Sequence, residues 1–122
     1  MIAAKSKFDR YIDGVVKICK RKDRKSDFGA RHNVDTMDDL EVLEKLNYQE
    51  MSKRVEDITF ANQEGFELTM KIKVRKIKNV TSENVVVIDN SMHSIKYIDS
   101  DKENLYLYLQ GERKIETGNN QK

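Results

Sequence analysis

The stretch Phe66-Glu67-Leu68-Thr69-Met70-Lys71-Ile72-Lys73-Val74-Arg75 decides the fold class of this chain. Its even positions are apolar, and its odd positions are polar or charged. A period of two is typical of a strand with one buried and one solvated face, as in an antiparallel sheet. The alternation therefore predicts a strand over residues 66–75, with Lys71, Lys73 and Arg75 as a basic row on its outer face.

The residues that follow predict further antiparallel strands joined by short turns. The β-branched run Val85-Val86-Val87-Ile88 and the segment Ser94–Ile98 flank the turn cluster Asp89-Asn90-Ser91, which indicates a hairpin. After a polar turn at residues 99–104, the strand Leu105-Tyr106-Leu107-Tyr108-Leu109 carries leucines on one face and tyrosines on the other. Such a meander closes most simply as a small barrel or sandwich.

The N-terminal half is less regular. Tyr11–Cys19 has the composition of a strand, in which Gly14 marks a bulge or a close approach of another group. Thr36 and Asp39 resemble a capping box that begins a helix. The apolar residues after Thr36 are three apart, which favours one short helix: Met37, Leu40, Leu43 and Leu46.

The segment 48–61 stays open between two structures. Its apolar spacing fits a helix, whereas Ile58-Thr59-Phe60 is typical of a strand. The chain as a whole is expected to be mainly β, a small antiparallel β-barrel or sandwich with a long charged loop and one short helix. We expect a single β-barrel domain over residues 1–110, with an inserted loop at about residues 20–46. A flexible C-terminal tail is expected at residues 111–122, where Ile115 is the only large apolar residue.

Composition excludes several classes of protein. The net charge of +2 in 122 residues argues against a dedicated nucleic-acid binder with a strong basic excess. No apolar run reaches the roughly 18–20 residues of a membrane span, and the first residues lack the apolar stretch of a secretory signal, so we expect a protein of the cytoplasm without membrane contact. Cys19 is the single cysteine, and in a strand it is expected to behave as a small hydrophobe rather than as a reactive thiol.

Charge is distributed in two adjacent blocks of opposite sign. Such blocks suit a subunit whose one end meets the other end of a neighbour, although two solvated loops explain them equally well. The basic loop could meet DNA phosphates or an acidic protein surface, but residues 20–25 include no aromatic side chain to stack on bases. The basic loop carries Lys20, Arg21, Lys22, Arg24, Lys25 and Arg31, and the acidic docking segment carries Asp35, Asp38, Asp39, Glu41 and Glu44.

No pattern predicts catalysis, a metal site or a cofactor. Ser91 and Ser94 flank His93, but polar residues are what a hairpin turn requires. The segment Asp99-Ser100-Asp101-Lys102-Glu103 lacks the glycine and the distal glutamate of a calcium loop. The glycines are scattered singly, without a phosphate-binding motif. Glu56 and Asp57 are adjacent and fit better as charges at a helix N-terminus or on the surface. We therefore expect a protein that is not an enzyme.

The order of these elements resembles the head–tail connector (head-closure or stopper) proteins of long-tailed bacteriophages. The resemblance covers roughly residues 11–114 and rests on patterns of hydrophobicity and turns. Its first element is a strand at residues 11–19, followed by a long loop that contains Asp27-Phe28-Gly29-Ala30. The segment 53–61 then leads into the strand 66–75, and the hairpin 86–98 and the closing strand 105–109 follow.

The resemblance implies a small β-barrel assembled as a hexameric ring below the portal and adaptor rings. Such a ring closes the DNA-filled head and offers a docking platform to the tail. Its implied partners are copies of itself, portal or adaptor proteins, tail terminator or tail proteins, and packaged DNA. The loop at residues 20–46 would help to retain the DNA, although the helical pattern of residues 35–46 departs from an irregular loop. The implied location is the virion, after assembly in the bacterial cytoplasm.

A second hypothesis is a small nucleic-acid-binding or regulatory β-barrel. It would use the basic loop together with the row of Lys71, Lys73 and Arg75, and its affinity for DNA or RNA would depend on salt. The connector hypothesis predicts instead a monomer or weak oligomer in isolation, with higher assembly on a partner.

Overall fold

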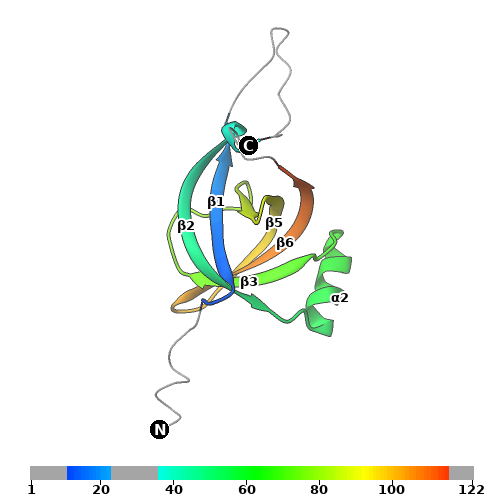
Figure 1. The fold of residues 1–122 in the computed structure, drawn as a ribbon. Helices are drawn as coiled ribbons and strands as arrows, with labels where there is room; N and C mark the ends of the chain where they lie inside the picture. Colours follow the sequence, from blue (N-terminus) through cyan, green and yellow to red (C-terminus); the bar gives the residue numbers. More distant parts are fainter. Residues whose placement is uncertain (1–10, 23–35, 116–122) are drawn as a thin grey trace.

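Six antiparallel strands form a closed barrel in the computed structural model, which describes residues 11–22 and 36–115. Around the barrel the strands run in the order β1-β2-β3-β6-β5-β4, and β4 pairs back onto β1 (Figure 1). The prediction of a mainly β, antiparallel fold is confirmed. The strands are β1 (Gly14–Arg21), β2 (Leu40–Met51), β3 (Met70–Arg75), β4 (Val85–Ile88), β5 (Ser91–Ser100) and β6 (Asn104–Lys114).

The inner core contains alternate side chains from β1, β3, β4 and β6, as the alternation predicts, together with a few from β2 and β5. Ile72 and Val74 of β3 are fully buried, next to the leucines of β6. The prediction of leucines facing the core is confirmed, since Leu105, Leu107 and Leu109 all belong to this cluster. Burial of these apolar side chains supplies the main favourable free energy of folding.

The β4–β5 hairpin is closed by the turn that its sequence predicts. Asp89 and Asn90 both have positive φ angles, 50° and 65°, which is the pattern of a two-residue type I′ turn. Ile88 and Ser91 are paired directly across this turn. The right-handed twist of such a turn matches that of the two strands, so the local sequence fixes the register here.

The helix predicted within residues 36–46 is wrong. Thr36 and Asp39 do form the predicted capping box, with Asp39 accepting a hydrogen bond from the Thr36 N–H at 3.2 Å, but the turn they cap is only the short 3-10 helix η1 (Met37–Asp39). Leu40 then begins β2. The inserted loop at residues 20–46 is corrected accordingly, because Lys20 and Arg21 complete β1 and residues 40–46 belong to β2.

A β-bulge explains why the spacing suggested a helix. Ile18 faces Glu44, whereas the next residue Cys19 faces Val42, so Leu43 is an extra residue in β2. The extra residue shifts the alternation, and Leu40 therefore packs in a different cluster from Leu46. A strand with an inserted residue thus shows apolar side chains three apart, which a helix also does.

The open segment 48–61 contains both structures in succession. β2 continues to Met51, and helix α2 (Val55–Glu64) follows and ends at Gly65 in a left-handed conformation. The predicted strand 66–75 is shorter, because regular pairing of β3 begins at Met70. Phe66 and Leu68 pack instead under α2 with Tyr108, where the helix covers the tyrosine face of β6.

The C-terminal tail predicted at residues 111–122 is wrong in its first part. β6 extends to Lys114, and the Ile115 N–H donates to the Asn90 carbonyl at 2.8 Å. Ile115 is buried in a second cluster on the outer wall of the barrel, with Cys19, Leu40 and Val85 among its members. A single apolar residue in a polar stretch anchored the strand, which composition alone did not indicate. Residues 116–122 lie outside the described part of the chain.

Gly14 is needed because another group comes close to it, as predicted. Its φ angle is 148°, and a Cβ atom at this position would lie 3.2 Å from Cε1 of Tyr48. The Tyr48 ring, which belongs to the inner core, therefore packs directly on the backbone of β1. The bulge lies elsewhere, between Ile18 and Cys19.

Candidate functional site

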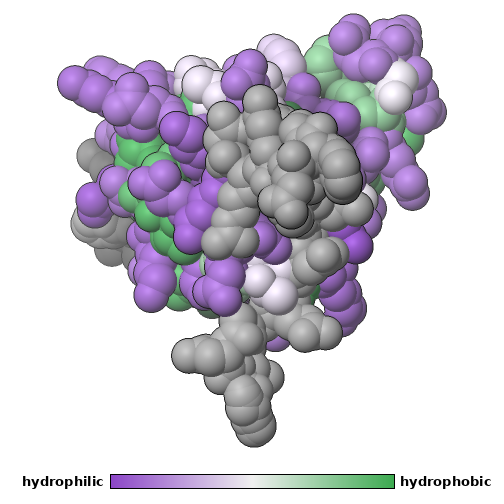
Figure 2. Space-filling view, turned by 90° about the horizontal axis from the view of Figure 1, so that it is seen from above, coloured by the Kyte–Doolittle hydropathy of each residue, from purple (hydrophilic) through white to green (hydrophobic). Residues whose placement is uncertain are grey.

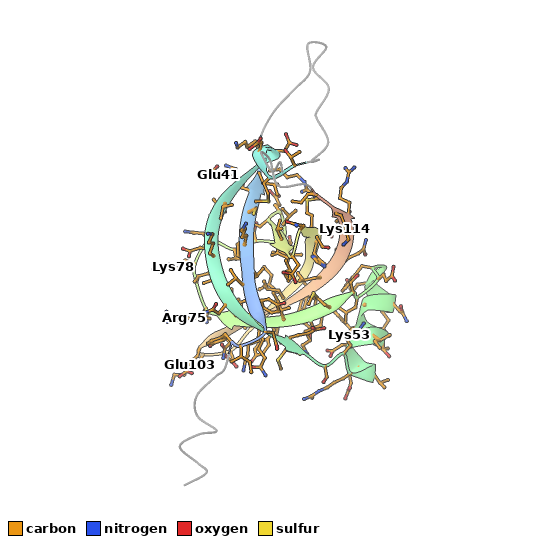
Figure 3. The ribbon with its side chains drawn as sticks, viewed as in Figure 1. Glu41, Lys53, Arg75, Lys78, Glu103 and Lys114 are labelled. Atoms are coloured by element: carbon orange, nitrogen blue, oxygen red, sulfur yellow. The ribbon has the colours of Figure 1, made fainter. Side chains whose placement is uncertain are left out.

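The structure brings the basic and acidic segments together within one chain. Lys20 of β1 is the register partner of Glu41 of β2, and the Lys22 N–H donates to the Asp39 carbonyl at 3.0 Å. Glu41 marks this end of the barrel in Figure 3. Of the predicted residues, Arg24, Lys25, Arg31 and Asp35 lie outside the described residues, whereas Asp38, Asp39, Glu41 and Glu44 lie in η1 and β2.

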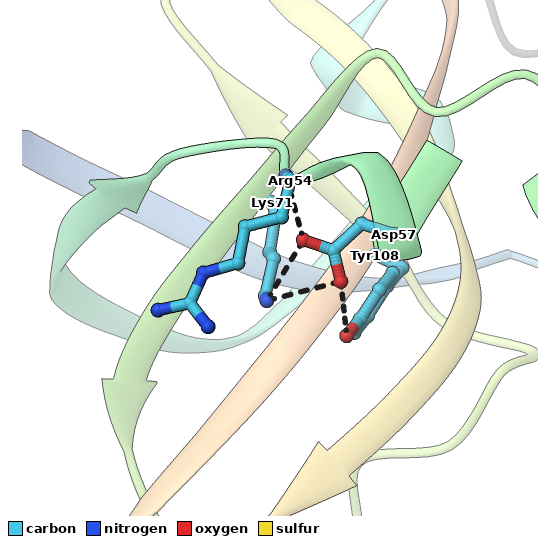
Figure 4. Close-up of polar contacts among 4 residues, drawn as sticks. All are labelled: Arg54, Asp57, Lys71 and Tyr108. Atoms are coloured by element: carbon cyan, nitrogen blue, oxygen red, sulfur yellow. Dashed lines mark hydrogen bonds and ion pairs between the residues drawn. The ribbon is translucent and has the colours of Figure 1, made fainter. Parts of the chain in front are cut away.

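A buried ionic cluster holds α2 on the barrel. The Asp57 carboxylate accepts hydrogen bonds from the Arg54 N–H at 3.0 Å, from Lys71 Nζ at 3.2 and 3.3 Å, and from the Tyr108 hydroxyl at 3.1 Å (Figure 4). Lys71 Nζ also lies 5.1 Å from the centroid of the Tyr108 ring. This cluster joins α2 to β3 and β6. Its role is structural, since each carboxylate oxygen is already occupied by the protein.

The electrostatics of the cluster agree with its geometry. Burial disfavours the charged form of Asp57, but the hydrogen bonds from Arg54, Lys71 and Tyr108 outweigh it and lower the pKa of this carboxyl group. Burial, followed by the bond to Asp57, raises the pKa of Tyr108 to about 12. At neutral pH the cluster is therefore a carboxylate held by an ammonium group and a neutral phenol.

A basic cleft lies at the end of the barrel opposite Glu41. It has a volume of about 600 Å³ and is lined by Tyr11, Ile77, Glu103 and four cationic side chains, Arg75, Lys76, Lys78 and Lys102. Figure 3 places Arg75 and Glu103 at this end, with Lys78 on the same side of the barrel but nearer its middle. A second cavity of about 240 Å³ shares Tyr11 and Arg75 with the first and adds Lys45.

The turn beside the cleft is held by Asp101. Its carboxylate accepts hydrogen bonds from the N–H groups of Glu103 and Asn104 at 2.9 and 2.8 Å and from the Tyr106 hydroxyl at 2.8 Å. The bond from Tyr106, followed by the two backbone bonds, lowers the pKa of Asp101. The turn predicted at residues 99–104 is shorter than predicted, because Asp99 and Ser100 belong to β5 and Asn104 begins β6. The contacts of Asp101 close the remaining connection, residues 101–103.

Cys19 is a buried hydrophobic residue, as predicted. Its side chain is fully buried in the outer cluster, and burial raises the pKa of the thiol to about 11. The thiolate, which is the reactive form, is therefore disfavoured at neutral pH.

His93 is not in the turn but in β5, where it is buried. Its Nδ1 atom has no hydrogen-bond partner within the described part of the chain. Ser94 donates to the Glu112 carboxylate at 2.7 Å and not to the imidazole. Burial lowers the pKa of His93, against weaker opposing effects of the Ser91 backbone and of Glu112. The imidazole is therefore held in its neutral form.

We expect the stability of the fold to fall as the pH drops below the usual histidine pKa. The unfolded chain binds a proton at His93 near about pH 6.5, whereas the folded chain binds it only at lower pH. The contribution of the neutral His93 to stability is thus complete above about pH 6.5, and it is lost as the pH falls toward the pKa of His93 in the folded chain. Urea unfolding at about pH 7.5 and about pH 5.5 measures this difference. His93→Phe should reduce it, and an unchanged pH dependence in that variant would contradict the assignment.

Three further observations bear on function. No group of three His, Cys, Asp or Glu side chains among the described residues is arranged to hold a metal ion. Within residues 11–22 and 36–115, no helix has the length and hydropathy to cross a bilayer. Compared with protein-family models and with curated proteins, the chain matches no family model and no curated protein.

Proposed function

We propose that this chain is a structural subunit that assembles head to tail into a ring, as in the phage head-closure proteins that its sequence resembles. The observation that carries the proposal is a pair of exposed apolar surfaces on different sides of the barrel. The first, called here the β2 surface, consists of Val42 and Leu43, each 41% exposed. The second, the helix surface, consists of Val55 and Ile58 of α2, 78% and 44% exposed.

The two surfaces lie far apart on the molecule. β2 is on the left of the barrel and α2 on the right (Figure 1). Seen from above, hydrophobic residues gather on the left and again over the helix (Figure 2). A two-fold dimer uses the same patch on both copies, whereas a ring requires two different patches that fit each other. Two separate apolar surfaces therefore favour a head-to-tail arrangement.

The β2 surface borders a hollow to which we assign the helix surface of a neighbouring copy. A hollow of about 180 Å³ lies beside Leu43 and is lined by Ile18, Ile77 and Val80 as well as by polar residues. Val55, at the first turn of α2, projects into solvent. An apolar side chain of this size fits a hollow of that volume, so we place Val55 of one copy in the hollow of the next.

The closed barrel leaves little sheet edge through which copies can meet. Each of the six strands has a hydrogen-bonded strand on both sides over part of its length, whereas residues 40–47 of β2 pair with β1 alone among the described strands. We assign the contacts between copies to the exposed side chains of the β2 surface and the helix surface. This arrangement suits a ring in which each subunit keeps its own fold and the charged segments at the Glu41 end remain available to other proteins.

The proposal is tested by cross-linking a variant that carries Leu43→Cys and Val55→Cys. A short flexible bismaleimide should give a ladder of species that stops at a closed ring of about six chains, because each copy joins two neighbours. Cys19 does not interfere, since it is buried and its thiol pKa is raised to about 11. Native mass spectrometry identifies the largest species.

The two single variants serve as matched controls. Each carries only one reactive surface cysteine, so its cross-linked products should be no larger than dimers. A variant with Glu83→Cys in place of Val55→Cys has two cysteines but lacks the helix surface, and it should give no ladder. A tight two-fold dimer of the unmodified chain, or equal ladders from both double variants, would contradict the head-to-tail ring.

A further inference from the structure

The basic cleft consists of two cavities that share two residues, and this continuity defines its shape. The cavities of about 600 and 240 Å³ both include Tyr11 and Arg75. The larger volume falls within the range of roughly 300–1,000 Å³ that is usual for small-ligand sites. Two cavities that meet at one aromatic residue suit an extended ligand with repeating units better than a single compact molecule.

The charges of the cleft are strongly one-sided. Five cationic side chains line the two cavities, and among the described residues Glu103 is the only carboxylate that does so. Arg75, Lys78 and Lys102 are exposed. These cations come from β2, from the end of β3, from the β3–β4 connection and from the β5–β6 turn, while the chain as a whole has a net charge of only +2. The fold therefore concentrates positive charge at this site.

Tyr11 gives the cleft a fixed aromatic wall. Its hydroxyl donates to the Asn104 side chain at 2.6 Å, and Asn104 is itself only 4% exposed. Lys73 Nζ lies 5.9 Å from the centroid of the Tyr11 ring. A tyrosine held in this way pays little additional conformational entropy on binding. Ile77 adds an apolar surface to the same cavity.

We propose that this cleft binds single-stranded nucleic acid. Phosphates of successive nucleotides contact Arg75, Lys78 and Lys102, and a base lies against Tyr11 and Ile77. An acidic peptide would use the cations but not the aromatic wall, whereas a nucleotide chain uses both. The inference goes beyond the ring, since it assigns a ligand to the basic cleft, which borders the hollow beside Leu43 through Ile77 and Lys78.

The test is fluorescence anisotropy of labelled oligo-dT at low salt, with the full chain. The variant Arg75→Glu/Lys78→Glu/Lys102→Glu should bind at least about tenfold more weakly and with a smaller dependence on salt, because fewer counterions are released. The variant Lys53→Glu/Lys96→Glu/Lys114→Glu changes the net charge by the same amount on other faces of the barrel and should keep most of the affinity. Circular dichroism confirms that both variants are folded.

The role of the Tyr11 side chain is tested separately. Tyr11→Leu should weaken binding about fivefold or more, whereas Tyr11→Phe, which keeps the ring and loses only the hydroxyl, should retain most of it. Equal losses in the two charge variants, or no binding of oligo-dT at low salt, would overturn the proposal. Binding of poly-glutamate but not of oligo-dT would reassign the cleft to an acidic peptide, and tighter binding of duplex DNA would exclude the single-stranded assignment. The assay uses the chain at concentrations at which it is monomeric, so that no neighbouring copy covers Ile77 and Lys78. Its outcome is therefore separate from that of the cross-linking test.

Discussion

Replacing Leu107 with Ala is expected to lower the free energy of unfolding by about 3–4 kcal/mol. Leu107 is fully buried at the centre of β6, between Ile72 of β3 and Ile98 of β5. The substitution removes apolar contacts and leaves a cavity that a closed barrel cannot easily collapse, because each strand is fixed by two neighbours. Urea denaturation followed by circular dichroism measures the change.

Leu43→Ala is the matched control, since it deletes the same atoms from the bulge of β2. Leu43 is 41% exposed, so its substitution should cost less than about 1 kcal/mol. Comparable losses in the two variants would show that the core is not where the structure places it.

Replacing Asp57 with Ala is expected to cost roughly 3 kcal/mol and to loosen α2 from the barrel. The substitution leaves the Lys71 ammonium group and the Tyr108 hydroxyl without the carboxylate that both contact, in a site where the Asp57 side chain is only 10% exposed. Hydrogen exchange should show faster exchange in α2, with β1 and β4 less affected. Glu56→Ala, one residue earlier and exposed, should change stability by less than about 0.5 kcal/mol.

The same cluster predicts a second effect of acid, separate from that of His93. The folded pKa of Asp57 is lowered, so its contribution to stability is present above the unfolded value of about 3.9 and is lost as the pH falls through the folded pKa. Asp57→Asn should therefore flatten the pH dependence below about pH 4 and leave the His93 step unchanged. A variant with the full acid dependence would contradict the assigned role of Asp57.

The fold could be predicted where side-chain period and turn chemistry agree. The alternation through Val74, the run Val85–Ile88 and the Asp89-Asn90 turn all depend on neighbouring residues, and the structure confirms them. The prediction failed in β2, where the extra residue Leu43 disturbs a period that is otherwise two. It also failed at Ile115, because the burial of one side chain depends on strands distant in sequence.

The basic cleft could not be predicted in the same way. Three of its five cations, Arg75, Lys76 and Lys78, are close in sequence, but Lys45 and Lys102 come from distant parts of the chain. The basic row was anticipated on β3, but Lys71 is used by Asp57, and only Arg75 lines the cleft. Tyr11 is separated by more than ninety residues from its partner Asn104, so nothing in its local sequence indicates a binding wall.

The position of β6 has a consequence for how the chain reaches its native state. β6 lies between β3 and β5, and its leucines occupy the middle of the inner core. During synthesis the first five strands emerge before β6, and they cannot form the closed barrel without the strand that pairs with both β3 and β5. Most pairings then form between residues distant in the chain, which slows folding and exposes strand edges in the meantime. Until β6 has been synthesised, the edges of β3 and β5 that it pairs with therefore remain open.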